Sequence, residues 1–390
     1  MKIKIGIFLG MEPSGGGMFQ YGISVLEALS RLPKDTYEVI AAYTYNGWLA
    51  YVNAYGIQPV KLPPSFIGRV IWKILYKCSI PLNLLRSTSK YFHPIIKTIV
   101  QQRCALWIFP SEDQLAYQCP VNSLVSIHDL MHRYERQFPE VSANGIFEKR
   151  EEKYKCLSKF ATAILVDSFL GKSQVMKCYG VNENRVHVLP YIAPKYITLR
   201  NSSPDFNTKY SLPNKFIFYP AQFWEHKNHK SLLLALYELK SKLPDLQLVL
   251  VGSEQNAFND VVRLIQELGI TDRVTILGYV PDRDIAEIYR RSRALVMPTF
   301  FGPTNIPPLE AFVVGCPVAI SNIYGIPDQV GDAALLFNPK SVEEIAETIF
   351  RLWTDDDLAK ELIAKGRRKA LEWNSNSFYH CLEEIIKEII

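Results

Sequence analysis

Acidic residues are absent from a long part of the N-terminal half. No Asp or Glu occurs from Val39 to Ser111, while eight Lys and Arg residues fall in the same stretch. They are Lys61, Arg69, Lys73, Lys77, Arg86, Lys90, Lys97 and Arg103. The whole chain has a formal charge of only +5, so positive charge is concentrated in this region. The asymmetry indicates an anionic partner, and because no nucleic-acid recognition motif accompanies it, nucleic acid is not expected.

Long apolar runs, paired cysteines and metal-binding patterns are also absent. No apolar run reaches the roughly 18–20 residues of a membrane span. Glu12 and three glycines follow the first short apolar run, so we interpret that run as a strand and not as a signal peptide. The seven cysteines have no paired spacing, which suggests reduced thiols in a cytosolic protein and offers no zinc site.

The length predicts two α/β domains, because 390 residues exceed one ordinary core. Short apolar runs alternate with helical segments, as in doubly wound sheets. The predicted strands are Ile3–Leu9, Tyr37–Tyr43, Ala105–Phe109, Ser123–Ile127, Ala163–Val166, Val186–Leu189, Phe216–Tyr219, Gln247–Val251, Val274–Leu277, Ala294–Met297 and Pro317–Ile320. The turn-forming residues Asn201–Asn207 predict a linker, which gives an N-terminal domain at 1–200 and a C-terminal domain at 201–372. Thr354–Asp357 is interpreted as a helix N-cap and not as a metal site.

The segment Phe301–Ala311 predicts a loop that leads into a helix. Pro307 and Pro308 suit the first helical positions, where no backbone N–H is required. The free N–H groups at such a helix start attract a diphosphate. Glu310 is expected in the first turn, where it either accepts hydrogen bonds from two ribose hydroxyls or only complements the helix dipole.

Two further segments suit phosphate chemistry. Lys227 lies between a predicted strand and a predicted helix, where an ammonium group stabilises negative charge on a departing diphosphate, although a solvated surface lysine is the alternative. Gly15, Gly16 and Gly17 follow the first strand and permit close backbone approach to a phosphate or sugar, or form a plain turn.

Together, Phe301–Ala311 with Gly315–Val318, and Tyr219–His229 with Lys227, resemble the donor-binding motifs of the retaining GT-B glycosyltransferases of the GT4 type, in a mannosyltransferase-like branch. Ile127–Asp129 and Leu248–Gly252 agree more weakly. The resemblance implies an α/β GT-B fold, with two Rossmann-like doubly wound domains facing a central cleft. It also implies that a C-terminal helix at 373–390 crosses back to the N-terminal domain.

The resemblance implies specific site residues. The catalytic residues would be His128, Lys227 and Glu310, with Asp129 orienting the ring of His128; alone, His128 would be an ordinary buried histidine. The implied donor-binding residues are Gly15, Gly16, Gly17, Gln222, Lys227, Val280, Thr304, Asn305, Ile306, Pro307 and Glu310. No metal or cofactor is implied, because the leaving diphosphate is thought to help deprotonate the acceptor.

Two positions depart from the family pattern. The usual arginine five residues before the lysine is Gln222, and the usual glutamate eight residues before the second glutamate is Gly302. One positive and one negative group are missing together, which favours a rearranged site over a decayed one. We hypothesise that Gln222 is a neutral donor to a phosphate or sugar oxygen, and that Thr304 and Asn305 take over sugar contacts.

The expected function is transfer of a sugar from a nucleotide diphosphate, with GDP-mannose as the leading donor. The expected acceptor is a hydroxyl of a lipid-linked or cell-surface glycan, in polysaccharide biosynthesis. The alternatives are a catalytically silent GT-B assembly subunit, which the two departures support, and a GT-B sugar-nucleotide epimerase.

A basic helix is predicted around Arg69, Lys73 and Lys77, which recur every four residues and form one stripe. Ile67, Trp72 and Tyr76 add interfacial character. Such a helix lies on an anionic membrane surface, or is a solvated face. The expected location is the cytoplasm, with a peripheral position on the inner face of the cell membrane.

Overall fold

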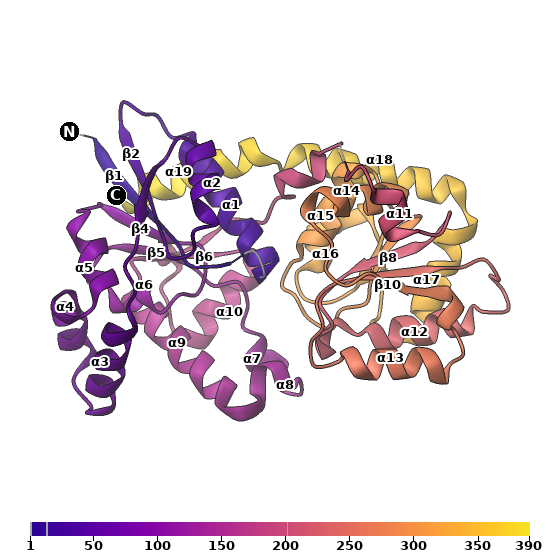
Figure 1. Ribbon diagram of the computed structural model, residues 1–390, viewed down its shortest axis with the longest axis horizontal. Coiled ribbons are helices and arrows are strands. Elements are labelled where there is room, and N and C mark those ends of the chain that lie inside the picture. Colours follow the sequence, from indigo (N-terminus) through magenta and orange to yellow (C-terminus); the bar gives the residue numbers. More distant parts are fainter. Residues whose placement is uncertain (1, 13–14, 201) are drawn as a thin grey trace. The chain divides into compact units, whose positions relative to one another are not determined.

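The computed structural model describes residues 2–12, 15–200 and 202–390 (Figure 1). Its residues form two compact units. Unit 1 consists of Met1–Leu130, Glu148–Pro190 and Ser375–Ile390, and unit 2 consists of Met131–Phe147 and Tyr191–Asn374.

Unit 1 is built on a seven-stranded sheet in which every described pair of neighbours is parallel. The order is β3-β2-β1-β4-β5-β6-β7. The strands are β1 (Ile3–Leu9), β2 (Tyr37–Tyr43), β3 (Gln58–Lys61), β4 (Leu106–Phe109), β5 (Ser123–Ser126), β6 (Ala163–Val166) and β7 (Val186–Val188). The central strands β4, β5 and β6 are apolar runs that are buried along their whole length, as parallel strands covered on both faces require.

Helices flank the sheet of unit 1 (Figure 1). They are α1 (Gly17–Ser30), α2 (Trp48–Ala54), α3 (Phe66–Lys77), α4 (Leu82–Phe92), α5 (Pro94–Gln101), α6 (Leu115–Gln118), α9 (Ile146–Phe160), α10 (Phe169–Tyr179) and α19 (Ser375–Ile389), with a 3₁₀ turn η3 (Glu183–Arg185). The C-terminal helix α19 packs on α1. Phe378 is fully buried there, with its ring 6.2 Å from that of Tyr21, and Arg31 donates a hydrogen bond to the carbonyl of Ser375 at 3.1 Å.

Unit 2 is built on a six-stranded parallel sheet with the order β10-β9-β8-β11-β12-β13. The strands are β8 (Ile217–Pro220), β9 (Leu248–Val251), β10 (Val274–Ile276), β11 (Ala294–Met297), β12 (Val318–Ser321) and β13 (Leu335–Phe337). Its core is one continuous apolar cluster that runs through these strands and the helices α12, α14 and α17.

The helices of unit 2 are α7 (Met131–Tyr134), α8 (Pro139–Ser142), α11 (Phe206–Tyr210), α12 (His229–Glu238), α13 (Phe258–Glu267), α14 (Asp282–Arg291), α15 (Ile306–Val314), α16 (Ile326–Val330), α17 (Val342–Thr354) and α18 (Asp356–Glu372). The 3₁₀ turns are η2 (Ala143–Gly145), η4 (Lys195–Thr198), η5 (Glu225–Lys227), η6 (Thr271–Arg273) and η7 (Gly331–Ala333). The predicted N-cap before α18 is confirmed, because the Asp355 carboxylate accepts from the N–H groups of Asp357 and Leu358 at 3.0 and 2.9 Å.

The connection between the units differs from the predicted boundary at 200, whereas Ser375–Ile390 returns to unit 1 close to the predicted boundary at 372. The connection from unit 1 to unit 2 falls at Pro190–Tyr191, and Met131–Phe147 leaves the N-terminal half for unit 2. Asn201 lies outside the described residues. The rest of the predicted linker belongs to unit 2, where Ser203 donates through its N–H and its hydroxyl to the buried Asp284 carboxylate, at 2.7 Å each. These contacts fold turn-forming residues into the unit.

Candidate functional site

The loops that follow β8 and β11 define the candidate site of unit 2. These strands are neighbours in the sheet, and the chain leaves β8 toward β9 but leaves β11 toward β12 on the other side. The strand order therefore reverses between them. In open α/β sheets, ligands bind at this switch point, outside the carboxyl ends of the strands. Both loops carry the residues that the sequence singled out.

The loop after β8 holds Lys227 at the end of η5, with an intermediate exposure. Asn228 follows in the left-handed conformation, with φ 57° and ψ 37°, and caps α12 by accepting from the N–H of Ser231 at 3.4 Å. Its side-chain amide also donates to the carbonyls of Pro298 and Pro339, at 2.9 Å each. Because Asn228 is buried and bonded to two distant loops, it fixes the backbone that carries Lys227.

The loops after β8 and β11 are joined directly. The N–H of Phe300 donates to the carbonyl of His226 at 2.8 Å, and the Thr299 hydroxyl donates to the same carbonyl at 3.3 Å. Gly252, at the end of β9, lies against the first of these loops, since a Cβ there would be 2.2 Å from the carbonyl oxygen of Ala221. Lys227 and the start of α15 are thus parts of one connected structure.

Helix α15 begins at Ile306, with Pro307 in its first turn as predicted. Asn305 is the residue before it, and its backbone is bound on both sides by Gln329. The N–H of Asn305 donates to Gln329 Oε1 at 2.9 Å, and Gln329 Nε2 donates to the Asn305 carbonyl at 2.6 Å. The Asn305 side chain is 8% exposed, and its Nδ2 has no hydrogen-bond partner among the described residues. A buried donor of this kind is suited to a ligand oxygen.

Gly302 and Asn305 are coupled sterically. Gly302 has φ +148°, and a Cβ added to it would lie 2.5 Å from Nδ2 of Asn305. A glutamate at position 302, as in the family pattern, would need both a strained backbone and the space that Asn305 fills. Gly302 and Asn305 therefore depend on each other, because the Asn305 side chain fills the space that a larger residue 302 would need.

Glu310 lies in the second turn of α15, so the expectation of a first-turn carboxylate is wrong. Its side chain is buried, with 5% exposure. The hydroxyl of Tyr289 on α14 donates to Oε2 at 2.6 Å, and the hydroxyl of Tyr196 on η4 donates to Oε1. Burial raises the pKa of Glu310, the two tyrosine hydrogen bonds oppose this, and the nearby Asp282 raises it further. Each carboxylate oxygen keeps a lone pair for a second donor.

Gln222 and Val280 also lie in unit 2. The side-chain oxygen of Gln222 accepts from the indole N–H of Trp224 at 2.9 Å, which leaves the amide N–H groups as donors. Val280 follows Gly278, which has φ +65°, and its side chain is buried in the core. Only its backbone is suited to contact a nucleobase. Thr304 lies beside Asn305 with intermediate exposure.

Residues 131–147 supply contacts to this site that the sequence did not reveal. The Glu140 carboxylate accepts from the N–H and the Nδ1 of His226 at 3.1 and 2.7 Å, and from Asn256 at 2.9 Å. Burial alone would raise the pKa of Glu140, but these hydrogen bonds lower it to about 2. Phe138 stacks on Phe300 with ring centroids 5.8 Å apart. Residues 131–147 therefore contact both the loop after β8 and the loop after β11, although they lie far from both loops in the sequence.

The corresponding switch point of unit 1 lies between β1 and β4. Gly16, between β1 and α1, has φ 57° and ψ −122°, a conformation open essentially to glycine alone. A Cβ at Gly16 would meet nothing within 4 Å among the described residues, so space is not the reason for glycine here. Gly16 and Gly17 are exposed, and Gly15 is half-buried. The backbone at the start of α1 is thus accessible for close approach.

His128 follows β5 in unit 1 and is contacted by both backbone and side-chain groups. Its Nε2 lies 2.9 Å from the carbonyl of Pro110, its N–H donates to Glu112 at 3.1 Å, and its ring meets that of Tyr21 edge-on at 5.0 Å. Asp129, expected to orient the ring, forms an ion pair with Arg150 at 2.5 Å. The role of His128 toward a donor sugar stays a prediction.

The predicted basic stripe lies on the exposed side of α3. Arg69, Lys73 and Lys77 are exposed, and large apolar side chains accompany them: Phe66 is 72% exposed, Ile67 70% and Ile74 55%. Trp72, expected to add interfacial character, is buried against the ring of Tyr117. The expectation for Trp72 is therefore wrong, because this face of α3 anchors the helix to unit 1. Among the described residues, no helix combines the length and the apolar character needed to cross a bilayer.

Two parallel Rossmann-like sheets, of seven and six strands, define the GT-B class of glycosyltransferase folds. The sequence comparison with known families concerns unit 2. Residues 204–369, which lie within unit 2, match the family model for glycosyl transferases group 1. The chain is thus similar to this family over that part of its length.

Two relatives illustrate the similarity in sequence. The O-antigen chain mannosyltransferase B of Escherichia coli is 31% identical over 231 residues, which are 58% of this chain and 60% of that protein. The O-antigen chain mannosyltransferase RfbU of Salmonella typhimurium is 23% identical over 358 residues, covering 87% of this chain and 90% of that protein. The match to a serotype-specific mannosyltransferase of Escherichia coli spans only 32% of that relative.

Solved structures agree on the fold. A glycosyltransferase from Rickettsia africae superposes with a TM-score of 0.72 at 18% identity, over 100% of this chain and 98% of that chain. Anabaena Alr3699/HepE in complex with UDP and glucose superposes with a TM-score of 0.73 at 15% identity, over 99% of both chains. At these identities the likeness concerns the fold alone.

Proposed function

We propose that the protein is a retaining glycosyltransferase that moves a sugar from a nucleotide diphosphate to a hydroxyl of a lipid-linked or cell-surface glycan. The bond between the anomeric carbon and the diphosphate oxygen breaks, and the acceptor oxygen bonds to the same face of that carbon. The acceptor proton passes to the departing diphosphate. No protein nucleophile and no metal ion are part of this step.

One observation supports the proposal above all: Lys227 and the start of α15 lie on joined loops at the switch point of unit 2. Lys227 would stabilise the charge that grows on the diphosphate. The N–H of Ile306 and the positive dipole end of α15 would bind the same group, since Pro307 and Pro308 carry no N–H and the Asn305 N–H is bonded to Gln329. Gln222 and the backbone of Val280 would contact the phosphate and the base, and Glu310 the ribose.

Contacts to the sugar are assigned to a different set of residues. Asn305, with its buried unpaired Nδ2, and Thr304 beside it would replace the glutamate that Gly302 removes. The roles of His128 and of the Gly15–Gly17 backbone toward a donor sugar stay predictions from the family resemblance. Neutral contacts of this kind are weaker than charged ones.

The leading donor is GDP-mannose, because the relatives are named as mannosyltransferases. UDP-glucose must be tested beside it, since a structural neighbour is in complex with UDP and glucose. The experiment is a transfer assay with purified protein, radiolabelled GDP-mannose or UDP-glucose, and a lipid-linked oligosaccharide extract as acceptor. Labelled glycan with a retained anomeric configuration, determined by NMR, is the expected result.

The same assay separates the alternatives. Nucleotide binding without transfer to any acceptor would contradict the proposal and favour a silent assembly subunit. Conversion of the donor sugar in the absence of acceptor would contradict it in favour of an epimerase. Rhamnosyl and N-acetylhexosaminyl donors extend the screen if neither of the first two donors reacts.

We also propose that α3 docks the enzyme on an anionic membrane surface. Phe66, Ile67 and Ile74 would enter the interface, while Arg69, Lys73 and Lys77 attract anionic head groups, at about 1 kcal/mol for each basic residue near the surface. A solvated face would explain the three basic residues but not the exposed apolar side chains beside them. A bilayer interface accounts for both the charges and the apolar side chains.

Liposome sedimentation tests this docking at low salt. The wild type is expected to bind vesicles with anionic phospholipid and to release them as salt rises, because surface attraction is screened within about 8–10 Å. Charge reversal of Arg69, Lys73 and Lys77 should abolish binding but preserve transfer to a soluble acceptor analogue. A matched control is charge reversal of Lys149, Lys155 and Lys177, exposed or half-exposed on α9 and α10. Wild-type protein that ignores anionic vesicles would refute the docking.

A further inference from the structure

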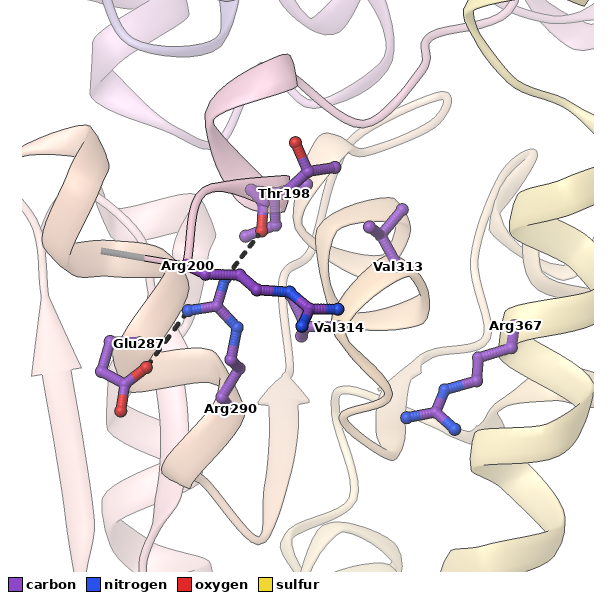
Figure 2. A pocket seen from close by; sticks show the side chains of 8 residues that line it. Thr198, Arg200, Glu287, Arg290, Val313, Val314 and Arg367 are labelled. Carbon is purple, nitrogen blue, oxygen red and sulfur yellow. Dashed lines mark hydrogen bonds and ion pairs between the residues drawn. The ribbon is translucent and has the colours of Figure 1, made fainter. Parts of the chain in front are cut away.

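A pocket of unit 2 is lined by three arginines and has a volume of about 560 Å³ (Figure 2). Its walls come from η4 and from α14, α15 and α18. Val313 and Val314, at the C-terminal end of α15, form its apolar part. In a parallel sheet the helices run opposite to the strands, so the C-terminal end of α15 lies at the edge away from the loops after β8 and β11. The pocket is therefore separate from the proposed donor site.

Arg290 is held firmly in this pocket. Its Nη1 forms an ion pair with Glu287 at 3.1 Å, and its Nη2 donates to the carbonyl of Ile197 at 3.3 Å and to that of Leu199. Glu287 also accepts from Nε of Arg291 at 2.8 Å. The single carboxylate of the lining is thus shared between two arginines and neutralises little of the remaining charge.

Arg200 and Arg367 differ from Arg290 in that their guanidinium groups are uncommitted. Both are exposed, and in the described parts of the chain neither has a hydrogen-bond or ion-pair partner. Figure 2 shows the two side chains extending into the pocket from opposite sides. Arg367 packs over the C-terminal end of α15, next to Gly315, whose φ is +80°. A Cβ added to Gly315 would lie only 2.6 Å from Nη2 of Arg367. That contact limits the positions open to its guanidinium.

We propose that this pocket binds the phosphoryl group of a small phosphorylated organic ligand. Arg200 and Arg367 donate to its oxygens, since guanidinium forks match a phosphate better than ammonium groups do. Arg290 adds positive charge from a fixed position. Val313 and Val314 contact the carbon part of the ligand. The volume suits a ligand of that size, because small-molecule sites occupy about 300–1,000 Å³.

Titration calorimetry on the full chain tests the proposal, with phenyl phosphate and inorganic phosphate as probes. The wild type should bind phenyl phosphate more tightly than inorganic phosphate, because only the former reaches the valines. Arg200→Glu/Arg367→Glu should weaken phenyl phosphate binding by about 100-fold, the loss of two charged contacts. The control Lys242→Glu/Arg368→Glu makes the same change of charge at exposed positions outside the lining, and should bind within about twofold of the wild type.

Two further variants test whether the phenyl phosphate binding belongs to this pocket. Lys227→Ala should still bind phenyl phosphate in the pocket of Arg200 and Arg367, because Lys227 belongs to the other site. The milder Arg200→Gln/Arg367→Gln should weaken binding by about tenfold. This neutral variant replaces the charge-reversal variant if circular dichroism shows that charge reversal disturbs folding. The proposal is overturned if the wild type binds neither probe, if the arginine variants bind as tightly as the control, or if only Lys227→Ala loses binding.

Discussion

The switch points of the two units use the same topology but hold their functional groups by different means. In unit 1, Gly16 provides a backbone conformation that other residues avoid, and His128 rests on the carbonyl of Pro110. In unit 2, side chains do the positioning: Asn228 joins two loops, Gln329 holds Asn305, and Glu140 braces His226. The glycine of the first arrangement depends on backbone geometry, and the second arrangement depends on a network of hydrogen bonds.

This difference bears on how each site responds to mutation. Replacing one glycine removes the backbone conformation that only glycine adopts. In a hydrogen-bond network, replacing one side chain removes one of several partners. Single side-chain changes in unit 2 should therefore have graded effects that depend on the partner removed. In unit 1, the effect should depend sharply on which glycine is replaced.

The largest effect is expected for Lys227→Ala in unit 2. Turnover in the transfer assay should fall by about 10²–10³, because one group that stabilises transition-state charge is lost. Thermal stability should change little, since the ammonium is not buried. Lys230→Ala, at the exposed second residue of α12, is the control and should retain wild-type turnover. Unchanged turnover in folded Lys227→Ala would end the assignment of this lysine.

A smaller effect on stability is expected for Glu140→Gln. The carboxylate has a pKa of about 2 against a usual 4.5, so its stabilising contribution is present above about pH 4.5 and is lost as the pH falls toward 2. At pH 7 the variant should be less stable by about 2 kcal/mol in urea unfolding, and the difference should shrink below pH 4.5. Glu225→Gln on η5, next to His226, is the control, because burial and the nearby Glu140 raise the pKa of Glu225 and its charge is not stabilising. A pH-independent difference would contradict the role given to Glu140.

For unit 1, Gly16→Ala should lower the free energy of unfolding by about 1–2 kcal/mol, because alanine is strained at φ 57° and ψ −122°. Gly17→Ala is the matched control. Gly17 is the first residue of α1 and has a helical conformation, so alanine there should be neutral or slightly stabilising. Equal effects of the two substitutions would show that unit 1 does not depend on the special backbone conformation of Gly16, and the contrast with unit 2 would be lost.

The smallest effect is expected for Asn305→Ala. Transfer efficiency should fall by about fivefold, as for loss of one neutral hydrogen bond, while affinity for the bare nucleoside diphosphate should stay within about twofold. Asn322→Ala, exposed in the loop after β12, provides a comparison that should leave both quantities unchanged. Normal transfer by Asn305→Ala would contradict the rearranged sugar contact. Gly302→Glu should not improve transfer, because its Cβ would meet the Asn305 side chain.

Much of the fold was predictable because parallel strands that are buried on both faces are apolar runs between turns. All eleven predicted strands are present within a residue or so of their predicted ends. The two strands that were not predicted, β3 and β13, are short and lie at sheet edges, and β3 contains Pro59. A proline and a half-exposed edge weaken the signal that marks a central strand.

The candidate site was predictable only where its residues lie in local motifs. Lys227, Asn305 and the start of α15 follow strands and carry glycine or proline signals. The partners of Glu310 do not: Tyr196 is 114 residues away and Tyr289 is 21 residues away. Glu140 reaches His226 across 86 residues. Such contacts are made by the tertiary fold, and no spacing within one sequence marks them.

Neither unit is a continuous piece of the chain, since unit 2 takes Met131–Phe147 from the N-terminal half and unit 1 takes Ser375–Ile390 from the end. During synthesis, unit 1 is complete only after α19 has been made, because Phe378 is buried where α19 packs on α1. The same interleaving sets the rule for building chimaeras with relatives. An exchange of unit 2 must carry both Met131–Phe147 and Tyr191–Asn374 and leave α19 with its host, because a single crossover near Pro190 would separate Glu140 from His226.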